Sequence, residues 1–239
     1  MSRRGYPTRR RRPARWLVAV IVILLVLLGL DFGTRAVAES VAATQIQKQA
    51  RLAAKPAVTF VGFPFLTQLV TRDFHHVDIG ITNLAEGPVT FSTVSATATS
   101  VKPTSFTFKQ MTIGHIDGTA LIDYASLGNT LTSQFGALGA LLHGAGLNLA
   151  AAGPQEVKAT INLVVTTGSA TWRIAQVGPR ELRIRLVGSS GLPASVLDSL
   201  HSLDLRIPKL PLGLTLDRVT VTPAGVVGTI SGSNVTVGS

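Results

Sequence analysis

The sequence contains no cysteine, and this absence removes several classes of protein at once. A disulfide-stapled scaffold, a zinc–thiolate site, an iron–sulfur cluster and a cysteine nucleophile all need that residue. Charged residues are also scarce, at 14% against 46% hydrophobic residues, which excludes a disordered chain. The 239 residues are therefore enough for one sizeable domain, or two small ones, with a hydrophobic core.

No acidic residue occurs before Asp31, and this stretch holds much of the basic charge. Seven of the 22 Lys and Arg residues, all of them arginines, fall within residues 1–15. Removing these seven leaves 15 basic residues against 12 acidic ones, so the rest of the chain is nearly neutral. The net charge of +10 thus belongs to one tail, and we expect no nucleic-acid partner.

Fifteen residues without a polar side chain, Trp16 to Leu30, follow the arginines. As a helix this run is about 22 Å long, shorter than the roughly 30 Å hydrocarbon core, and the flanking residues could close the difference. Positive charge before an apolar run keeps that end in the cytoplasm. We predict a basic cytoplasmic tail (1–15), a transmembrane signal anchor or signal-peptide core (16–33), and a single exported domain (34–239).

The segment Ala36-Val37-Ala38 has the small-x-small form of a signal-peptidase site. Cleavage after Ala38 would release a periplasmic or secreted protein. Retention would give a single-pass protein of the cell membrane with its body on the extracytoplasmic side. The long apolar run and Arg35 beside the cleavage site favour retention.

The exported part changes its hydrophobic period along the chain. Residues 31–54 predict a helix with a stripe of small side chains that includes Ala38, Ala42 and Ile46, ended before Pro56. Beyond it, alternation with period two, as in Val77, Ile79 and Ile81, predicts antiparallel strands with one solvated face. A second helix is predicted over residues 123–143, with Asp123 as its cap, and a helical turn over 193–200, with Asp198 as its cap. The fold class is α+β, with strands dominating.

Residues 60–69 concentrate three of the nine phenylalanines around a bend set by Gly62 and Pro64. One interpretation is an aromatic lip at the mouth of an apolar cavity, and the other is a corner of the core. On the residues alone the core corner is favoured.

The same segment, Gly-Phe-Pro-Phe-Leu-Thr-Gln at residues 62–68, resembles the actinobacterial envelope family typified by lipomannan elongation factor A. Further similar stretches are Gly118 to Tyr124 and residues 209–216, together with residues 219–227. The resemblance extends from about Asp31 to Val237. One departure is Arg-Asp-Phe-His-His at residues 72–76, where a short glycine-containing link is expected.

That resemblance implies a tubular lipid-binding (TULIP, BPI-like) fold, in which a long curved antiparallel sheet wraps around an amphipathic helix. It also implies non-enzymatic binding of a phospholipid or lipid-linked mannan in an apolar groove, in support of lipomannan or mannolipid maturation. A membrane contact through the N-terminal helix and an envelope glycosyltransferase partner are further expectations. The residues that we expect to line the groove are Phe60, Phe63, Phe65, Leu66, Leu69, Leu138, Leu141 and Leu142.

Motifs that carry chemistry are missing from the sequence. It has no Gly-x-Ser-x-Gly elbow, no His-Glu-x-x-His, no phosphate-binding loop and no dinucleotide fingerprint. The pair His76 and Asp78 has no third ligand nearby in sequence, so no metal and no cofactor is expected. Two alternatives to the lipid carrier remain: an envelope enzyme that modifies glycolipid, and a non-lipid, partner-binding structural domain.

Overall fold

The computed structural model describes residues 13–86, 89–134, 146–162, 167–178, 181–192, 202–206 and 213–237. Helices and strands alternate irregularly along them, and the bounds of each element are as follows. They are α1 (Pro13–Gln49), β1 (Ala57–Val61), α2 (Phe65–Thr71), β2 (Phe74–Glu86), β3 (Val89–Pro103), β4 (Met111–Asp123), α3 (Tyr124–Gln134), β5 (Asn148–Gly153), β6 (Glu156–Asn162), β7 (Thr167–Gly178), β8 (Glu181–Ser190), β9 (Ser202–Arg206), β10 (Thr215–Thr222) and β11 (Gly225–Val237).

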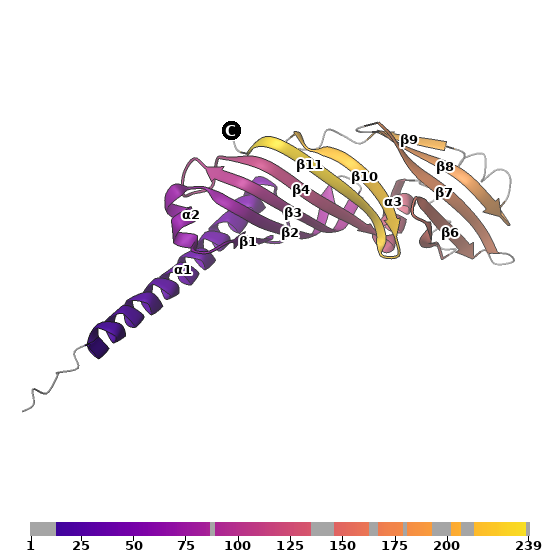
Figure 1. Ribbon diagram of the computed structural model, residues 1–239. Helices are drawn as coiled ribbons and strands as arrows, with labels where there is room; N and C mark the ends of the chain where they lie inside the picture. Colours follow the sequence, from indigo (N-terminus) through magenta and orange to yellow (C-terminus); the bar gives the residue numbers. More distant parts are fainter. Residues whose placement is uncertain are drawn as a thin grey trace, which may run out of the picture.

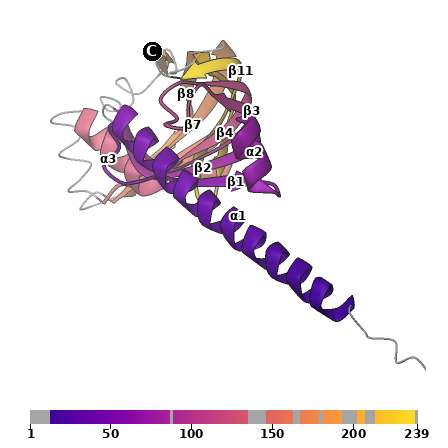
Figure 2. The same cartoon turned by 90° about the vertical axis from the view of Figure 1, so that its left-hand side faces the viewer.

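Six strands form the larger antiparallel sheet, in the order β1-β2-β3-β4-β11-β10. The last strand of the chain, β11, pairs along its whole length with β4 from the middle of the chain. Figures 1 and 2 show this sheet curving around the C-terminal half of α1, while the N-terminal half of the helix projects away from the body. Helix α1, the first four strands and the last two strands of the chain therefore pack together as one helix-and-sheet unit.

Strands β5 to β9 form a second antiparallel sheet, which extends the body away from α1 (Figure 1). The two sheets are joined by backbone and side-chain hydrogen bonds. Val221 N donates to Pro154 O at 2.8 Å, and Gln176 Nε2 donates to Leu216 O at 2.8 Å. The predicted α+β class with a large antiparallel sheet and an N-terminal apolar helix is confirmed. The strands nevertheless divide between two sheets, and the tubular type stays a prediction.

Helix α1 joins two segments that the sequence suggested as separate elements. The apolar run and the alanine-rich segment form one continuous helix, in which Ala38, Ala42 and Ala43 are buried against the body. The helix ends at Gln49, earlier than the predicted residue 54. It ends there because Arg51 takes a left-handed backbone (φ 51°), with Leu52 N donating to the Gln47 carbonyl oxygen.

The alternation of inward and outward side chains is reset along one line that crosses the larger sheet. In each of three strands, two consecutive residues face outward here, where regular alternation would have one. The buried residues on either side of them are Phe74 and Val77 in β2, Ala98 and Val101 in β3, and Ile113 and Ile116 in β4. Ser100 in β3 and Asn234 in β11 have left-handed backbones there, with φ of 54° and 52°. Such residues shift the side-chain alternation and bend a strand. The apolar residues of both halves therefore face the same side of the bent sheet.

Within the described residues, most of the buried apolar side chains gather in two clusters. The first lies between α1 and the near end of the larger sheet and includes Ala42, Phe60, Val77 and Ile116. The second includes Leu149, Val157, Ala159 and Val221, where β10 meets the second sheet, and Tyr124 and Trp172 pack against it. The half-buried Trp172 thus joins the second sheet to this cluster.

Candidate functional site

The phenylalanine-rich bend places its rings in two different environments. Phe60 and Phe65 are buried and form a cluster of four rings with Phe74 and Phe108, which we call the Phe cluster. The Phe60 centroid lies 4.6 Å from that of Phe74 and 5.5 Å from that of Phe65. Ring pairs at such distances add stability beyond the area they bury. The core-corner interpretation therefore describes Phe60 and Phe65.

Phe63 has 66% of its surface exposed, because it lies in the turn between β1 and α2. Gly62 permits this turn with φ of 119°, and a Cβ there would meet Gln68 Nε2 at 2.6 Å. Leu66 and Leu69 on α2 are half-buried. Leu138, Leu141 and Leu142 lie outside the described residues. The groove-lining role of all eight residues stays a prediction.

A partly exposed apolar surface lies on the inner face of the larger sheet, between the two core clusters. Two neighbouring cross-strand rows form it. One joins Ile79, Ala96, Gly118, Ile230 and Leu216, and the other joins Ile81, Val94, Ala120, Gly228 and Val219. We define the inner strip as the six side chains Ile79, Ile81, Val94, Ala96, Ala120 and Val219, all of which are half-buried.

The inner strip continues the face that α1 covers further along the sheet. The preceding row, Phe60, Val77, Ala98 and Ile116, is buried under α1. Side chains in the strip are small or medium-sized in the middle of the sheet, where Ala96 and Ala120 lie. An apolar sheet face of this kind normally gains stability by being covered, at about 25 cal/mol per Å² of buried apolar area. The strip thus offers a surface on which an apolar ligand could be buried.

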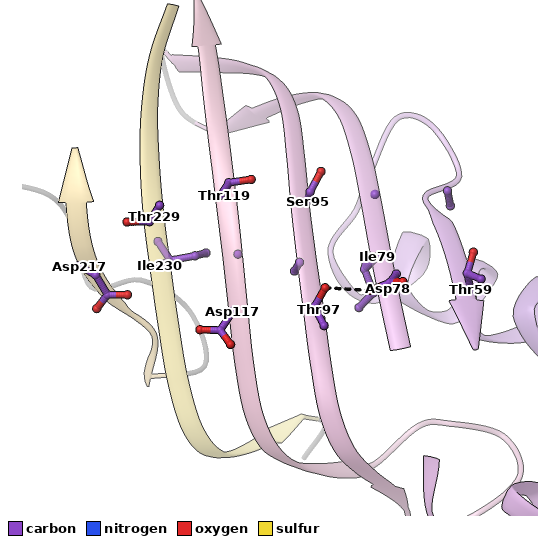
Figure 3. A pocket seen from close by; sticks show the side chains of 14 residues that line it. Thr59, Asp78, Ile79, Ser95, Thr97, Asp117, Thr119, Asp217, Thr229 and Ile230 are labelled. Atoms are coloured by element: carbon purple, nitrogen blue, oxygen red, sulfur yellow. Dashed lines mark hydrogen bonds between the residues drawn. The ribbon is translucent and has the colours of Figure 1, made fainter. Parts of the chain in front are cut away.

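The opposite face of the same sheet carries an open depression of about 570 Å³, which Ile79, Ala96 and Ile230 line together with Thr, Ser and Asp residues (Figure 3). The side chains of Thr59, Asp78, Thr97 and Asp117 follow one another across β1 to β4 in one row. Thr97 Oγ1 donates to Asp78 Oδ1 at 2.8 Å (Figure 3). This depression is open to solvent. Asp78 and Asp217 accept neighbouring hydroxyl donors, and Asp117 lies beside the His115 ring. It lies on the outer surface of the sheet, away from the two core clusters.

Histidines lie on this outer side as well. His75 and His76 are exposed on β2, and His115 Nε2 lies 3.1 Å from Asp117 Oδ2. His115 Nδ1 is 3.0 Å from the Ser233 hydroxyl. Among the described residues no group of three or more His, Asp or Glu side chains could hold a metal ion. These contacts are those of a solvated strand surface.

Two carboxylates of α1 bind backbone groups of the body, and the sequence analysis did not identify them. Asp31 is 4% exposed, and its Oδ1 accepts the Leu66 amide of α2 at 2.7 Å. Glu39 Oε1 accepts the Phe60 amide at 3.0 Å and the Arg35 Nε–H at 2.9 Å. The sequence offered one indication of such a role, for Asp31 alone: it is the first acidic residue of the chain and directly follows the apolar run.

Asp123 and Tyr124 lie where β4 passes into α3. Asp123 Oδ1 accepts the Ser126 amide at 2.6 Å, as predicted for a helix cap. This hydrogen bond to the charged form holds the pKa of Asp123 below its usual value. Burial raises the pKa of Tyr124, whose hydroxyl donates to the Thr222 carbonyl oxygen at 2.6 Å. Both residues serve the junction between the two sheets.

Comparison with known families indicates the class of ligand that this chain binds. Residues 29–231 match the LmeA-like phospholipid-binding family. The chain belongs to this family. The matched region runs from the end of the apolar run into β11, so it includes both sheets and the inner strip. No curated protein and no solved structure matches the chain significantly.

Family membership supports lipid as the class of ligand, in agreement with the sequence analysis. The family is not known as a family of enzymes. Helix α1 is long and apolar enough to cross a membrane, which is compatible with an anchor or a signal sequence. The inner strip itself was missed as a site, because strand alternation indicates which side chains share a face but not which part of that face is only half-buried.

Proposed function

We propose that this protein is a membrane-anchored, non-enzymatic carrier that holds a phospholipid against the inner strip on the extracytoplasmic side. The observation that carries the proposal is the half-buried inner strip, on a face that is buried as core at both ends. Membership of a phospholipid-binding family supports a lipid as its occupant.

Acyl chains suit this surface in extent and in energy. The strip crosses five strands at about 4.8 Å spacing, so its width is about 19 Å. Each methylene taken out of water contributes about 0.8 kcal/mol, so ten methylenes contribute about 8 kcal/mol. Free energy of that size corresponds to a Kd of about 1 μM without any polar recognition motif. A site of this kind leaves no catalytic signature in the sequence.

Retention of α1 is part of the proposal. The peptide bond after Ala38 lies within a continuous helix, and Ala38 is buried. Asp31 on one side of this bond and Glu39 on the other both bind amides of the body. Cleavage would need local unfolding of a packed helix and would remove the Asp31 contact. These contacts support a single exported domain that stays attached to the membrane.

The cargo and its destination rest on the family resemblance alone. We extend the proposal to lipid-linked mannan as a second cargo, with an envelope glycosyltransferase as the recipient, in support of mannolipid maturation. Nothing in the inner strip distinguishes one lipid headgroup from another, because its side chains are apolar.

Photocrosslinking tests the proposed site in the full chain. The protein is reconstituted into phosphatidylglycerol–phosphatidylethanolamine vesicles that contain a phospholipid with a diazirine in its acyl chain. After irradiation, mass spectrometry locates the crosslinked peptides. We expect crosslinks in α1, because this helix lies in the bilayer. We also expect crosslinks in β2, β3 and β4, which carry most of the inner strip. Crosslinks confined to α1 would show that the inner strip holds no lipid.

A matched pair of variants controls this experiment. Val94→Asn places an amide in the inner strip, whereas Val227→Asn changes a half-buried valine on the opposite face of the same sheet. Ala96→Phe fills the strip without adding a polar group. We expect Val94→Asn and Ala96→Phe to lose the strand crosslinks and Val227→Asn to keep them. Equal crosslinking in all three proteins would contradict the site.

A further inference from the structure

The end of the body from which α1 emerges carries exposed apolar side chains. Phe63 in the β1–α2 turn is 66% exposed, and Val70 on α2 is 77% exposed. Phe32 on α1, directly after Asp31, is 62% exposed. Isolated apolar residues on a surface are ordinary, but these lie on neighbouring elements at one end of the molecule.

Hydrogen bonding fixes this end of the body against α1. The Asp31 carboxylate accepts the Leu66 amide at 2.7 Å, so α2 begins beside the residue that follows the apolar run. Phe63 is three residues from Leu66, and its Cα therefore lies within about 11 Å of the Leu66 Cα. Both views of the chain show α2 beside α1 where the helix enters the sheet (Figures 1 and 2).

The length of the apolar run determines where this end lies relative to a bilayer. From Trp16 to Leu30 the helix rises about 22 Å, which is about 8 Å less than the hydrocarbon core. A short span thins the bilayer locally or draws its flanking residues toward the hydrocarbon. Asp31 does not oppose this position as a free surface charge would, because its side chain is buried in the contact with α2.

We propose that this end of the body docks on the extracytoplasmic leaflet of the membrane that α1 spans, with Phe63 and Val70 inserted among the lipid headgroups. Phe and aliphatic side chains such as Leu are typical of surfaces that bury their apolar face at the headgroup–acyl boundary. The occupant is the bilayer itself, because the same helix that supports this surface continues into the membrane. The inference rests on the proposed membrane anchor but not on lipid binding in the inner strip.

The absence of cysteine makes a site-specific test simple, since any introduced cysteine is the sole thiol. Phe63→Cys and Val70→Cys are labelled with the fluorophore NBD in the full chain, reconstituted into phosphatidylglycerol–phosphatidylcholine vesicles. Val187→Cys is the matched control, because Val187 is 46% exposed on β8 in the second sheet, at the far end of the body (Figure 1). Circular dichroism checks that each variant keeps its strands.

We expect the emission at positions 63 and 70 to shift to shorter wavelength and to lose intensity with doxyl-labelled lipid. Position 187 should respond to aqueous iodide instead. Equal iodide quenching at all three positions would overturn the docking. Protection from iodide at position 63 without doxyl quenching would overturn it as well, since protein would then cover the surface. Flotation and crosslinking distinguish failure of this proposal from failure of the proposed function. A full chain that fails to float with vesicles has no membrane anchor, which would overturn the docking. Doxyl quenching without strand crosslinks would support the docking and contradict only lipid binding in the inner strip.

Discussion

Replacing Asp31 with alanine tests how the membrane helix is attached to the body. The Asp31 carboxylate accepts the Leu66 amide, which belongs to the first turn of α2. The residue before this seven-residue helix is Pro64, which makes no side-chain capping bond. Asp31 therefore supplies from α1 the acceptor that a local cap residue would normally supply.

The expected loss follows from this geometry. A hydrogen bond to a charged group contributes about 1.5–3 kcal/mol, and an amide left without a partner in a part-buried position adds to the penalty. We expect Asp31→Ala to lower the free energy of unfolding of the body by about 2 kcal/mol. Asp31→Asn keeps an acceptor oxygen and should lose about half as much, at about 1 kcal/mol.

Hydrogen exchange measured by mass spectrometry on the full chain in detergent micelles provides the local readout. A loss of about 2 kcal/mol predicts exchange of the 65–71 peptide that is about 30-fold faster. Asp78→Ala is the control, because Asp78 is exposed and binds the Thr97 hydroxyl; it should change stability by less than about 0.5 kcal/mol. Equal effects of the two substitutions, or unchanged exchange in α2, would refute the reasoning.

Three further substitutions test the body. Phe60→Ala removes a fully buried ring of the Phe cluster and should cost about 3–5 kcal/mol in chemical unfolding, so a loss below 1 kcal/mol would contradict its core position. Gly225→Ala should unfold the β10–β11 turn, because Gly225 has φ of 147° and an added Cβ would clash with the Ile122 carbonyl oxygen. Near-native thermal stability of this variant would contradict the described geometry of the turn. Asp123→Ala should cost about 1 kcal/mol at pH 7. The pKa of Asp123 in the folded state lies below its unfolded value of about 3.8, so the stabilisation is present above about pH 4 and is lost as the pH falls through the lowered pKa. A difference in stability between variant and wild type that does not change with pH would contradict the cap.

Much of the local structure could be predicted from the sequence because it depends on near neighbours. The alternation of Val77, Ile79 and Ile81 predicted a strand and the faces of its side chains, and both are observed in β2. The Asp123 cap depends on a residue three positions away, and it too was predicted correctly. The extent of α1 was less accurate, because its end at Gln49 depends on the backbone of Arg51 rather than on Pro56.

The sequence by itself determined the apolar run after the arginines, the α+β class and the resemblance carried by residues 62–68, since each is a property of consecutive or periodic residues. Only the tertiary structure decided which phenylalanines of that segment are buried. It also decided that the strands divide between two sheets, and that Asp31 binds an amide 35 positions further along the chain. The inner strip belongs to this second group, because exposure depends on what the rest of the chain covers. Burial is set by contacts between residues distant in sequence, and those contacts exist only after folding.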